Sequence, residues 1–535
     1  MAMVVYSLLY PKIFRFAADV KDILSTQLVF KGRYRNFVLR WQDVMHLCFY
    51  LGIWCTIAVA FPNGIQDVRT KNAALIIGGL GLWRYSWWFI NFIRSQYYGR
   101  VHFPRMRAQA DRLWAMGWRP SHVHLVMTTY YEYPPTTHRC LESIVKEIRD
   151  AGIKATLWIG CGAKEDEDVI HDWFAARDED LDVVFVRQNV PGKRAAIGLA
   201  LRALSRHHTH PDDMAVLMDG DSMLGHGSLS KCLSILGTFR RIHALTTDEE
   251  AICNQSLWMQ KWLTLRFAQR RMWMQSHSLS NRVLTLTGRC SVFRAADVVN
   301  KEFIRLIEAD HLNHWFWGNF RFLSGDDKSS WYHLLSQKCG MIYVPDAMVY
   351  TLERIEGSVM KRAIDNTLRW SGNMLRNGMR AIRLGPRAVP PFIWWCLVDQ
   401  RITIWTTLAG IFTAVSTIVF VKTDFIYTYI LWIMMTRLLM SSALFFYSER
   451  IHISFPIILY CNQILTAFVK AYLIFRLPQQ RWANRMDQHF NHELMNGCLN
   501  RIAVLCINLL YLTILALGVL LIMRVLTWPD IQQLL

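Results

Sequence analysis

The stretch AVLMDGD (residues 215–221) is the part of this chain that decides its fold. A short apolar run typical of a buried β-strand ends directly in Asp219, Gly220 and Asp221. Strand-like runs occupy residues 122–129, 155–159 and 183–186 upstream, and helical patterns occupy residues 141–151 and 194–206. Strands alternating with helices indicate a parallel α/β sheet. Ligands bind at the carboxyl ends of such strands, where Asp219, Asp221 and also Glu132 are predicted to lie.

Asp219 and Asp221 form the first of two acidic pairs that indicate a binding or catalytic site. A divalent cation such as Mg²⁺ binds a few carboxylates together with phosphate oxygens, so a D-x-D at a strand end suits a metal-bound diphosphate. The other interpretation of this pair is a polar turn with solvated carboxylates.

The second acidic pair, Asp326 and Asp327, lies in FLSGDDKSSW (322–331). A carboxylate at the edge of the sheet is placed to take the proton from an acceptor hydroxyl, with Lys328 and Trp331 orienting a sugar. Ser324 and Asp327 also fit a capping box at a helix start, and carboxylates in a first turn favour the helix dipole. The cap and the catalytic interpretation are compatible at one helix start.

Three basic motifs accompany these acidic pairs. Lys193 and Arg194 follow Gly192 at a predicted helix start, which suits a phosphate or nucleotide or else forms a solvated turn. TGRCSVFR (287–294) offers Thr287, Gly288 and Arg289 to an acceptor or a sugar carboxylate, or is a turn into a strand.

Arg369 and Trp370 lie in a predicted helix over residues 359–382, in which Arg362, Arg369 and Arg376 recur every seven residues. The functional interpretation has Trp370 stacking on a sugar and Arg369 bracing a diphosphate. The alternative is a basic interfacial helix on anionic lipid.

The composition predicts a membrane protein with one large soluble domain. The chain is 53% hydrophobic and 13% aromatic with a net charge of +19, and its mean hydropathy is +0.15. Much of the basic excess flanks apolar segments, which favours lipid headgroups and a phosphate-bearing donor over nucleic acid. The twelve cysteines contain no C-x-x-C pair and are interpreted as reduced thiols.

The apolar segments divide the chain into three parts. Residues 1–99 are predicted to hold an interfacial helix (3–20) and two spans (44–61 and 73–93). Residues 100–385 form the soluble domain, which the basic flanks place in the cytosol. Residues 386–535 contain an interface helix (391–401), spans at 404–421, 425–447 and 502–525, and the segment 455–475, an interfacial or re-entrant element or a sixth span.

The order strand–D-x-D, G-D-D and R-W between membrane segments resembles the processive family 2 glycosyltransferases, such as cellulose and hyaluronan synthases. The runs at 282–295, 310–315, 322–331, 343–347 and 475–482 are similar to the bacterial alginate polymerases, the mannuronan synthases. The resemblance implies a GT-A-type α/β glycosyltransferase domain inserted between transmembrane helices.

The resemblance also implies roles for individual residues. Asp219 and Asp221 bind the donor diphosphate and Mg²⁺ (or Mn²⁺), Asp327 is the base, and Trp370 lines the acceptor site. Glu132 lies near the nucleotide base. Gln480, Arg481 and Trp482 resemble a gating loop over the donor.

The implied donor is GDP-mannuronic acid, and the implied product is poly-β-1,4-mannuronate. Arg282, Arg289 and Lys328 suit a uronate. The implied setting is the bacterial inner membrane, and the implied partner is a separate membrane co-polymerase subunit that binds cyclic-di-GMP, since the chain shows no such sensor of its own.

Two departures from the cellulose-type pattern speak against a UDP-sugar donor. Asn366 replaces the glutamine of Q-x-x-R-W, and Gly160-Cys161-Gly162 stands where a second carboxylate is expected. A UDP-sugar synthase of the hyaluronan, cellulose or chitin type is the second hypothesis. The third is an inactive transport or scaffold protein, favoured by Arg84 and Lys470 within apolar segments.

Overall fold

A computed structural model describes residues 68–177, 179, 181–188, 192–207, 209–253, 255–355, 357–448, 452, 454–482, 488–490 and 497–527, together with residues 48 and 52. The predicted interfacial helix at residues 3–20 lies outside the described residues. Of the predicted span at residues 44–61, only Cys48 and Gly52 are described.

An eight-stranded sheet forms the centre of the soluble domain, in the order β3-β2-β1-β4-β7-β6-β10-β5. The first four strands along the chain are parallel and coincide with the predicted ones: β1 (Val123–Thr129), β2 (Ala155–Cys161), β3 (Asp182–Arg187) and β4 (Met214–Asp219). Each is an apolar run covered by helices, which is the pattern of buried parallel strands.

The other half of the sheet differs from the predicted all-parallel arrangement. β7 (Cys290–Arg294) runs antiparallel to both β4 and β6 (Ile242–Ile252), while β10 (Gly340–Leu352) is parallel to β6, and β5 (Ser222–Leu224) is antiparallel to β10. The sheet is mixed because the chain enters β7 beside the carboxyl end of β4, with Cys290 opposite Met218. The loop before β7 therefore lies next to Asp219.

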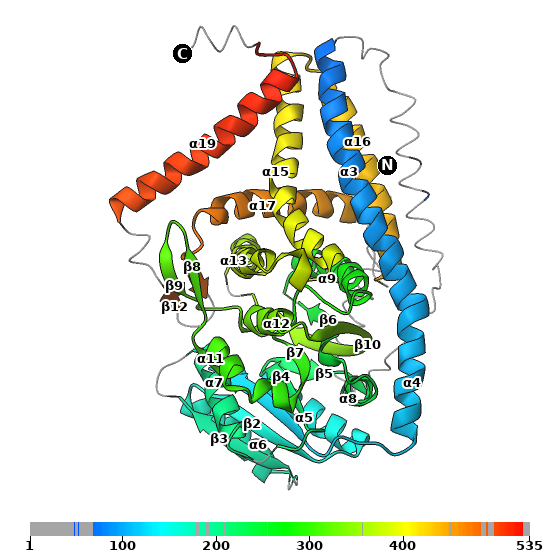
Figure 1. The fold of residues 1–535 in the computed structure, drawn as a ribbon, viewed down its shortest axis with the longest axis vertical. Coiled ribbons are helices and arrows are strands. Elements are labelled where there is room, and N and C mark those ends of the chain that lie inside the picture. Colours follow the sequence, from blue (N-terminus) through cyan, green and yellow to red (C-terminus); the bar gives the residue numbers. More distant parts are fainter. Residues whose placement is uncertain are drawn as a thin grey trace.

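Helices cover both faces of the sheet (Figure 1). One face packs on α5 (Pro134–Ala151) and α8 (Ser228–Thr238), and α6 (Lys164–Ala175) lies beside them. The other face packs on α7 (Lys193–Leu204), α11 (Lys301–Glu308) and α12 (Asp326–Ser336). α5 begins earlier than predicted because Pro134 and Pro135 suit a first helical turn.

Further elements complete the domain and lead toward the membrane helices. They are α9 (Leu257–Ser278), α10 (Ala295–Val298), the hairpin of β8 (His311–His314) and β9 (Gly318–Arg321), α13 (Val359–Arg383) and α14 (Gly385–Ala388). α13 matches the helix predicted from the sequence within one residue.

A long helical rod runs along one side of the molecule (Figure 1). α3 (Val68–Tyr97) continues through a π-helical turn (Tyr98–His102) into α4 (Phe103–Ala115). Arg84 of α3 forms an ion pair with Asp399, so the arginine within this predicted span has a carboxylate partner. In α4, Arg107 binds Asp346 through two contacts of 2.8 Å.

Among the described residues, four helices are long and apolar enough to cross a membrane: α15 (Pro391–Phe420), α16 (Phe425–Ala443), α17 (Phe455–Ile474) and α19 (Cys498–Ile522). Three of them, α15, α16 and α19, overlap the spans predicted at 404–421, 425–447 and 502–525 and end one to four residues earlier. α3, which contains the predicted span 73–93, is not among them. Leu509, Leu510 and Ile514 of α19 are more than half exposed, which suits a helix whose side chains face lipid.

The structure also tests two segments that the sequence predicts at the membrane interface, residues 391–401 and 455–475. The predicted interface helix at 391–401 is not separate: α15 runs through it into the predicted span, since no glycine or proline interrupts residues 393–409. α17 lies across α15 and α3, which stand upright (Figure 1). This direction fits the predicted interfacial element, although α17 is also long enough to span.

Candidate active site

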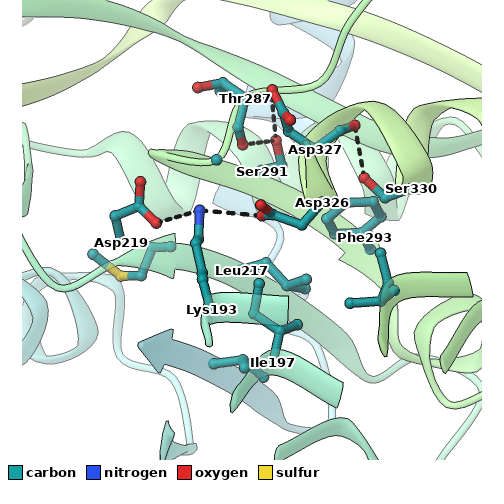
Figure 2. Close-up of a pocket in the computed structure, with 14 residues that line it drawn as sticks. Lys193, Ile197, Leu217, Asp219, Thr287, Ser291, Phe293, Asp326, Asp327 and Ser330 are labelled. Carbon is teal, nitrogen blue, oxygen red and sulfur yellow. Dashed lines mark hydrogen bonds and ion pairs between the residues drawn. The ribbon is translucent and has the colours of Figure 1, made fainter. Parts of the chain in front are cut away.

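A small pocket opens where β4, the loop before β7, and the first turns of α7 and α12 converge (Figure 2). Its polar lining consists of the residues Lys193, Asp219, Thr287, Gly288, Ser291, Asp326, Asp327 and Ser330. Both predicted acidic motifs therefore contribute to one site. They are more than a hundred residues apart in the sequence and meet because α12 packs on the face of the sheet beside β4.

Lys193 links the two acidic motifs. Its Nζ lies 2.7 Å from Asp219 Oδ1 and 3.1 Å from Asp326 Oδ2 (Figure 2). Burial opposes the charged form of Lys193, but the carboxylates of Asp219 and Asp326 hold its pKa above its usual range. A fixed positive charge thus stands at the carboxyl end of β4.

Gly288 lets the backbone pass close to this charged group. A Cβ at this position would lie 3.0 Å from Lys193 Nζ and 3.6 Å from Asp219 Oδ2. The neighbouring Thr287 accepts a hydrogen bond from the Arg289 amide at 3.2 Å through its Oγ1. The predicted Thr287 and Gly288 therefore line the pocket, with Gly288 nearest to its charges.

The turn before α12 is built on Gly325 rather than on a capping box. Gly325 is the N-cap with φ +89°, and no side chain caps the helix. Ser324 instead donates its hydroxyl to Asn373 Oδ1 at 3.2 Å, so the predicted capping box is wrong. Glycine adopts this left-handed backbone conformation with little strain. The turn at Gly325 places Asp326 and Asp327 in the first turn of α12.

The two carboxylates of this turn differ in their protonation behaviour. Burial raises the pKa of Asp327 to about 6, and the adjacent negative charge of Asp326 contributes in the same direction. Burial also opposes ionisation of Asp326, but Lys193 and then Arg194 outweigh it and lower its pKa. Asp326 is therefore held as an anion, while Asp327 has a proton affinity suited to general base catalysis near neutral pH.

Arg194 lies behind α12 instead of in the pocket. Its guanidinium is buried and donates to Leu306 O at 2.8 Å and to Ser329 Oγ at 2.9 Å. Asp310 accepts a hydrogen bond from Ser329 and pairs with Arg380 at 2.6 Å. Arg194 therefore supports the G-D-D turn from behind and, contrary to the sequence prediction, does not line the donor pocket.

Three further residues predicted at the sugar lie elsewhere. Trp331 is 1% exposed and donates its indole N–H to Val283 O at 2.7 Å, so it belongs to the core. Lys328 donates to Leu284 O at 2.7 Å. Arg282 binds the carbonyl of Asn281 at 2.7 Å, away from the pocket lining. Lys328 and Trp331 of α12 thus donate to backbone carbonyls of the loop before β7, the loop to which Arg282 itself belongs.

Arg289 and Arg369 carry positive charge near the pocket. Arg289 binds Glu249 Oε2 at 2.7 Å, and Arg270 approaches the other oxygen at 3.2 Å. Arg369 donates to Asn366 Oδ1 at 3.3 Å and lies within electrostatic range of Asp219. Asn366, which replaces the family's glutamine, therefore contacts the arginine of the R-W pair.

Trp370 stacks on Trp262 of α9, with ring centroids 6.0 Å apart and an angle of 24° between the planes. Arg266 lies over the Trp370 ring at 4.4 Å. The R-W pair thus points in two directions, with Arg369 toward the pocket and Trp370 toward α9.

The β1 end of the site contains a carboxylate that the sequence motifs did not indicate. Asp166 accepts from the backbone N–H groups of Tyr131 at 2.7 Å and Glu132 at 3.0 Å, in a turn where Tyr131 has φ +48°. Gly160, where a carboxylate was expected, packs on α7: a Cβ there would lie 2.9 Å from the Ala196 methyl group. Glu132 follows β1, whose Thr128 pairs with Asp219.

Gln480 connects the predicted gating loop to the acidic turn. Its side chain is buried, accepts from Leu323 N at 2.8 Å and donates to Arg321 O at 2.8 Å. Gln480, Arg481 and Trp482 form β11 (Gln480–Trp482), which pairs with β12 (Gln488–Phe490). This segment therefore holds the chain directly before the G-D-D turn.

The carboxylates of Asp219 and Asp221 suit a hard divalent cation. Asp219 is the last residue of β4 and lines the pocket, and Asp221 follows two residues later outside the pocket lining. Oxygen donors of this kind bind Mg²⁺ and Mn²⁺. Glu147, Asp150 and His226 also place three ligand atoms within 4.8 Å of one another. There, however, Glu147 already accepts the amides of Gly227 and Leu229, which makes it a helix cap.

Asp166, Glu249 and Asp310 are the supporting carboxylates that sequence reasoning missed. Each is buried and paired with backbone amides or arginines contributed by distant parts of the chain. A buried Asp or Glu has no local sequence pattern, although Asp310 lies in the DHLNHW run that carried part of the resemblance.

The comparisons with known proteins concern the family to which the domain is similar. The chain matches the family described as "Glycosyltransferase like family 2" over residues 120–373. It is 38% identical to Glycosyltransferase alg8 of Pseudomonas syringae pv. tomato, over 83% of this chain and 91% of that protein. It is 35% identical to Glycosyltransferase alg8 of Azotobacter vinelandii, over 83% of this chain and 90% of that protein.

Among solved structures, the chain is similar to the mannosyltransferase PcManGT from Pyrobaculum calidifontis in complex with GDP-Man and Mn²⁺. The identity is 15%, the TM-score is 0.42, and the similarity covers 72% of this chain and 98% of that one.

The relatives confirm the enzyme class and the fold predicted from the motifs. The molecule has a GT-A-like glycosyltransferase domain followed by several candidate transmembrane helices, and it is a membrane protein. The family match and the relatives support a glycosyltransferase, in place of the hypothesis of an inactive transport or scaffold protein. The chain belongs to the alginate polymerase-like family 2 glycosyltransferases, as its alg8 relatives do.

Proposed function

We propose that this enzyme transfers mannuronate from GDP-mannuronic acid to the end of a growing chain and produces poly-β-1,4-mannuronate with inversion at the anomeric carbon. The observation that carries the proposal is the placement of Asp327, with its raised pKa, in one pocket with Asp219 and Lys193. One base on one side and a diphosphate site on the other suit a single in-line displacement.

Asp327 is the proton acceptor in this proposal. The hydroxyl of the terminal acceptor sugar attacks the anomeric carbon of the donor and passes its proton to the Asp327 carboxylate. The bond from the anomeric carbon to the diphosphate oxygen breaks, and GDP leaves with the electron pair. Asp326, held as an anion by Lys193, keeps the proton affinity of Asp327 high, which makes it the better base.

Lys193, Asp219 and Asp221 bind the diphosphate end of the donor. Lys193 supplies a positive charge where negative charge develops on the leaving group, and Arg369 adds a second from the direction of α13. Asp219 and Asp221 would hold a divalent cation, which when bound neutralises the diphosphate as a Lewis acid. Gly288 keeps the loop thin enough for the phosphates to approach.

The donor is proposed from the alg8 relationship and from the cations near the pocket. Of the arginines and lysines expected to meet a uronate, Arg289 remains near the acidic motifs, and Arg369 joins it. A donor screen on membranes containing the chain tests this assignment with GDP-mannuronate, GDP-mannose, UDP-glucose and UDP-glucuronate. Polymer from GDP-mannuronate alone supports the proposal, and polymer from a UDP-sugar identifies the second hypothesis as correct.

The membrane helices are proposed to pass the product outward. The basic flanks of the apolar segments favour a cytosolic catalytic domain in the bacterial inner membrane. A separate membrane subunit that binds cyclic-di-GMP is proposed as the activating partner, because the alginate polymerases that the chain resembles use one. Co-expression with that subunit should raise polymer synthesis in a cyclic-di-GMP-dependent manner, and synthesis independent of both would contradict this partnership.

A further inference from the structure

Three cations lie where the catalytic domain meets the membrane helices, and none of them forms an ion pair with a carboxylate among the residues that the structure describes. Arg266 is on α9, Arg401 is on α15 and Lys470 is on α17, and all three are half-buried. Lys470 lies within electrostatic range of the other two and of Arg84. The carboxylate in range is Asp399, which is already paired with Arg84.

Arg266 illustrates the lack of counter-charge. Its guanidinium has an amide oxygen of Asn462 at 3.4 Å and lies over the rings of Trp262 at 5.0 Å and Trp370 at 4.4 Å. Burial lowers the pKa of Arg266 to about 10, and the group stays charged at neutral pH. Like charges gathered away from water cost free energy unless an anion joins them. The cluster therefore indicates an anionic ligand.

Arg369 and Trp370 of α13 lie between the acidic motifs and the cluster. Arg369 lies within electrostatic range of Asp219, and the next residue, Trp370, stacks on Trp262. Trp262 in turn stacks on Trp258 with centroids 6.1 Å apart and planes at 9°. Aromatic faces of this kind pack against the C–H faces of sugar rings, while the cations beside them pair with carboxylates.

We propose that Arg266, Arg401 and Lys470 form a cationic track that receives the growing polyanionic chain as it leaves the pocket toward the membrane helices. The inference rests on the proposed function, because a neutral polymer would leave these charges unpaired. An anionic lipid headgroup offers the same charge, but the three cations come from α9, α15 and α17 and converge on one another inside the molecule. A single chain of uronates extending from Trp370 fits that convergence.

The test measures chain binding separately from donor use. The full chain is placed in nanodiscs of zwitterionic lipid and titrated with oligomannuronate and with a neutral mannose oligomer of equal length. The wild type should bind the oligomannuronate more tightly, and salt should weaken that binding alone. Lys470→Met and Arg266→Met should each weaken it by about tenfold, whereas Lys470→Arg should retain it.

The matched control is Lys361→Met, which removes one exposed charge from the neighbouring helix α13 and should leave binding unchanged. The track is overturned if the wild type binds the neutral oligomer as tightly as the oligomannuronate, or if salt does not weaken its binding of oligomannuronate. Both results come from the wild type, so they hold even if the variants fail to fold. If the methionine variants bind the oligomannuronate normally but no longer retain anionic lipid, the cations bind lipid. That result would also overturn the proposed track.

Polymer length separates this inference from the proposed function. Variants that hold the chain weakly should release it early and make shorter polymers from GDP-mannuronate, while hydrolysis of the donor continues. A wild type that makes no polymer even with the activating subunit and cyclic-di-GMP present refutes the proposed function. An active wild type whose variants bind and elongate normally refutes the track alone.

Discussion

The rate of chain extension should fall on the acid side with an apparent pKa near 6. Burial and the neighbouring Asp326 raise the pKa of Asp327 from the ordinary 3.8 to about 6. A general base acts when ionised, so activity is full above this pKa and is lost as the pH falls through it. About half of Asp327 should be ionised at pH 6 and about one tenth at pH 5.

Asp326→Asn tests the cause of this raised pKa. The substitution keeps the size of the side chain and removes the like charge that lies beside Asp327. The pKa of Asp327 should therefore fall, and the acid limb should move to lower pH. The maximal rate should also fall, because a weaker base accepts the proton less readily and because Lys193 loses one of its two carboxylates.

The assay is the initial rate of labelled mannuronate incorporation between pH 5 and 8.5, at low and at saturating donor. Samples held at pH 5 and returned to pH 7.5 control for irreversible loss of fold. Asp327→Asn should reduce the rate by about 10²–10⁴ with donor binding retained. A rate that is flat down to pH 5, or an acid limb that stays at the same pH in Asp326→Asn, would refute the reasoning.

Three further predictions concern the turn, the scaffold and the cation. Gly325→Ala forces a left-handed residue at a cost of roughly 1–2 kcal/mol and brings a Cβ to 2.9 Å from the Asn373 amide, so turnover should fall with little change in donor affinity by isothermal titration. Arg107→Met leaves the buried Asp346 without its partner and should lower the free energy of unfolding in detergent by about 3–5 kcal/mol. The control Arg240→Met breaks an exposed ion pair and should lower it by less than about 1 kcal/mol. Chelation by EDTA should abolish sugar transfer, and added Mg²⁺ or Mn²⁺ should restore it. Activity that survives chelation would contradict a catalytic cation at Asp219 and Asp221.

The parallel half of the fold was predictable because its signals are local. β1 to β4 are apolar runs separated by helical patterns, and Asp219 follows the last of them directly. The antiparallel β7 was not predictable, because its direction depends on how α9 and the loop of Thr287 return the chain to the edge of β4. No local pattern in the sequence records that path.

Asp219, Asp326 and Asp327 line one pocket, and their catalytic and binding roles stay predictions. The roles of several neighbours were assigned by proximity in sequence. Arg194 directly follows Lys193 but points away from the pocket, since successive residues of a helix face different directions. Trp331 is buried in the core, where its indole donates to Val283 O. Gly325, not Ser324, makes the turn, because a left-handed backbone is a property of the path and not of a spacing rule. Asp310 and Glu249 were missed because their arginines come from distant segments.

The most direct test of the account is the stereochemistry of the product made by the wild type, Asp327→Asn and Asp327→Glu from α-linked GDP-mannuronate, measured by the anomeric proton signals of the polymer. We expect a β-linked polymer from the wild type, none above background from Asp327→Asn, and slow β-linked synthesis from Asp327→Glu. An α-linked product, or normal β-linked synthesis by Asp327→Asn, would contradict a single displacement with Asp327 as its base.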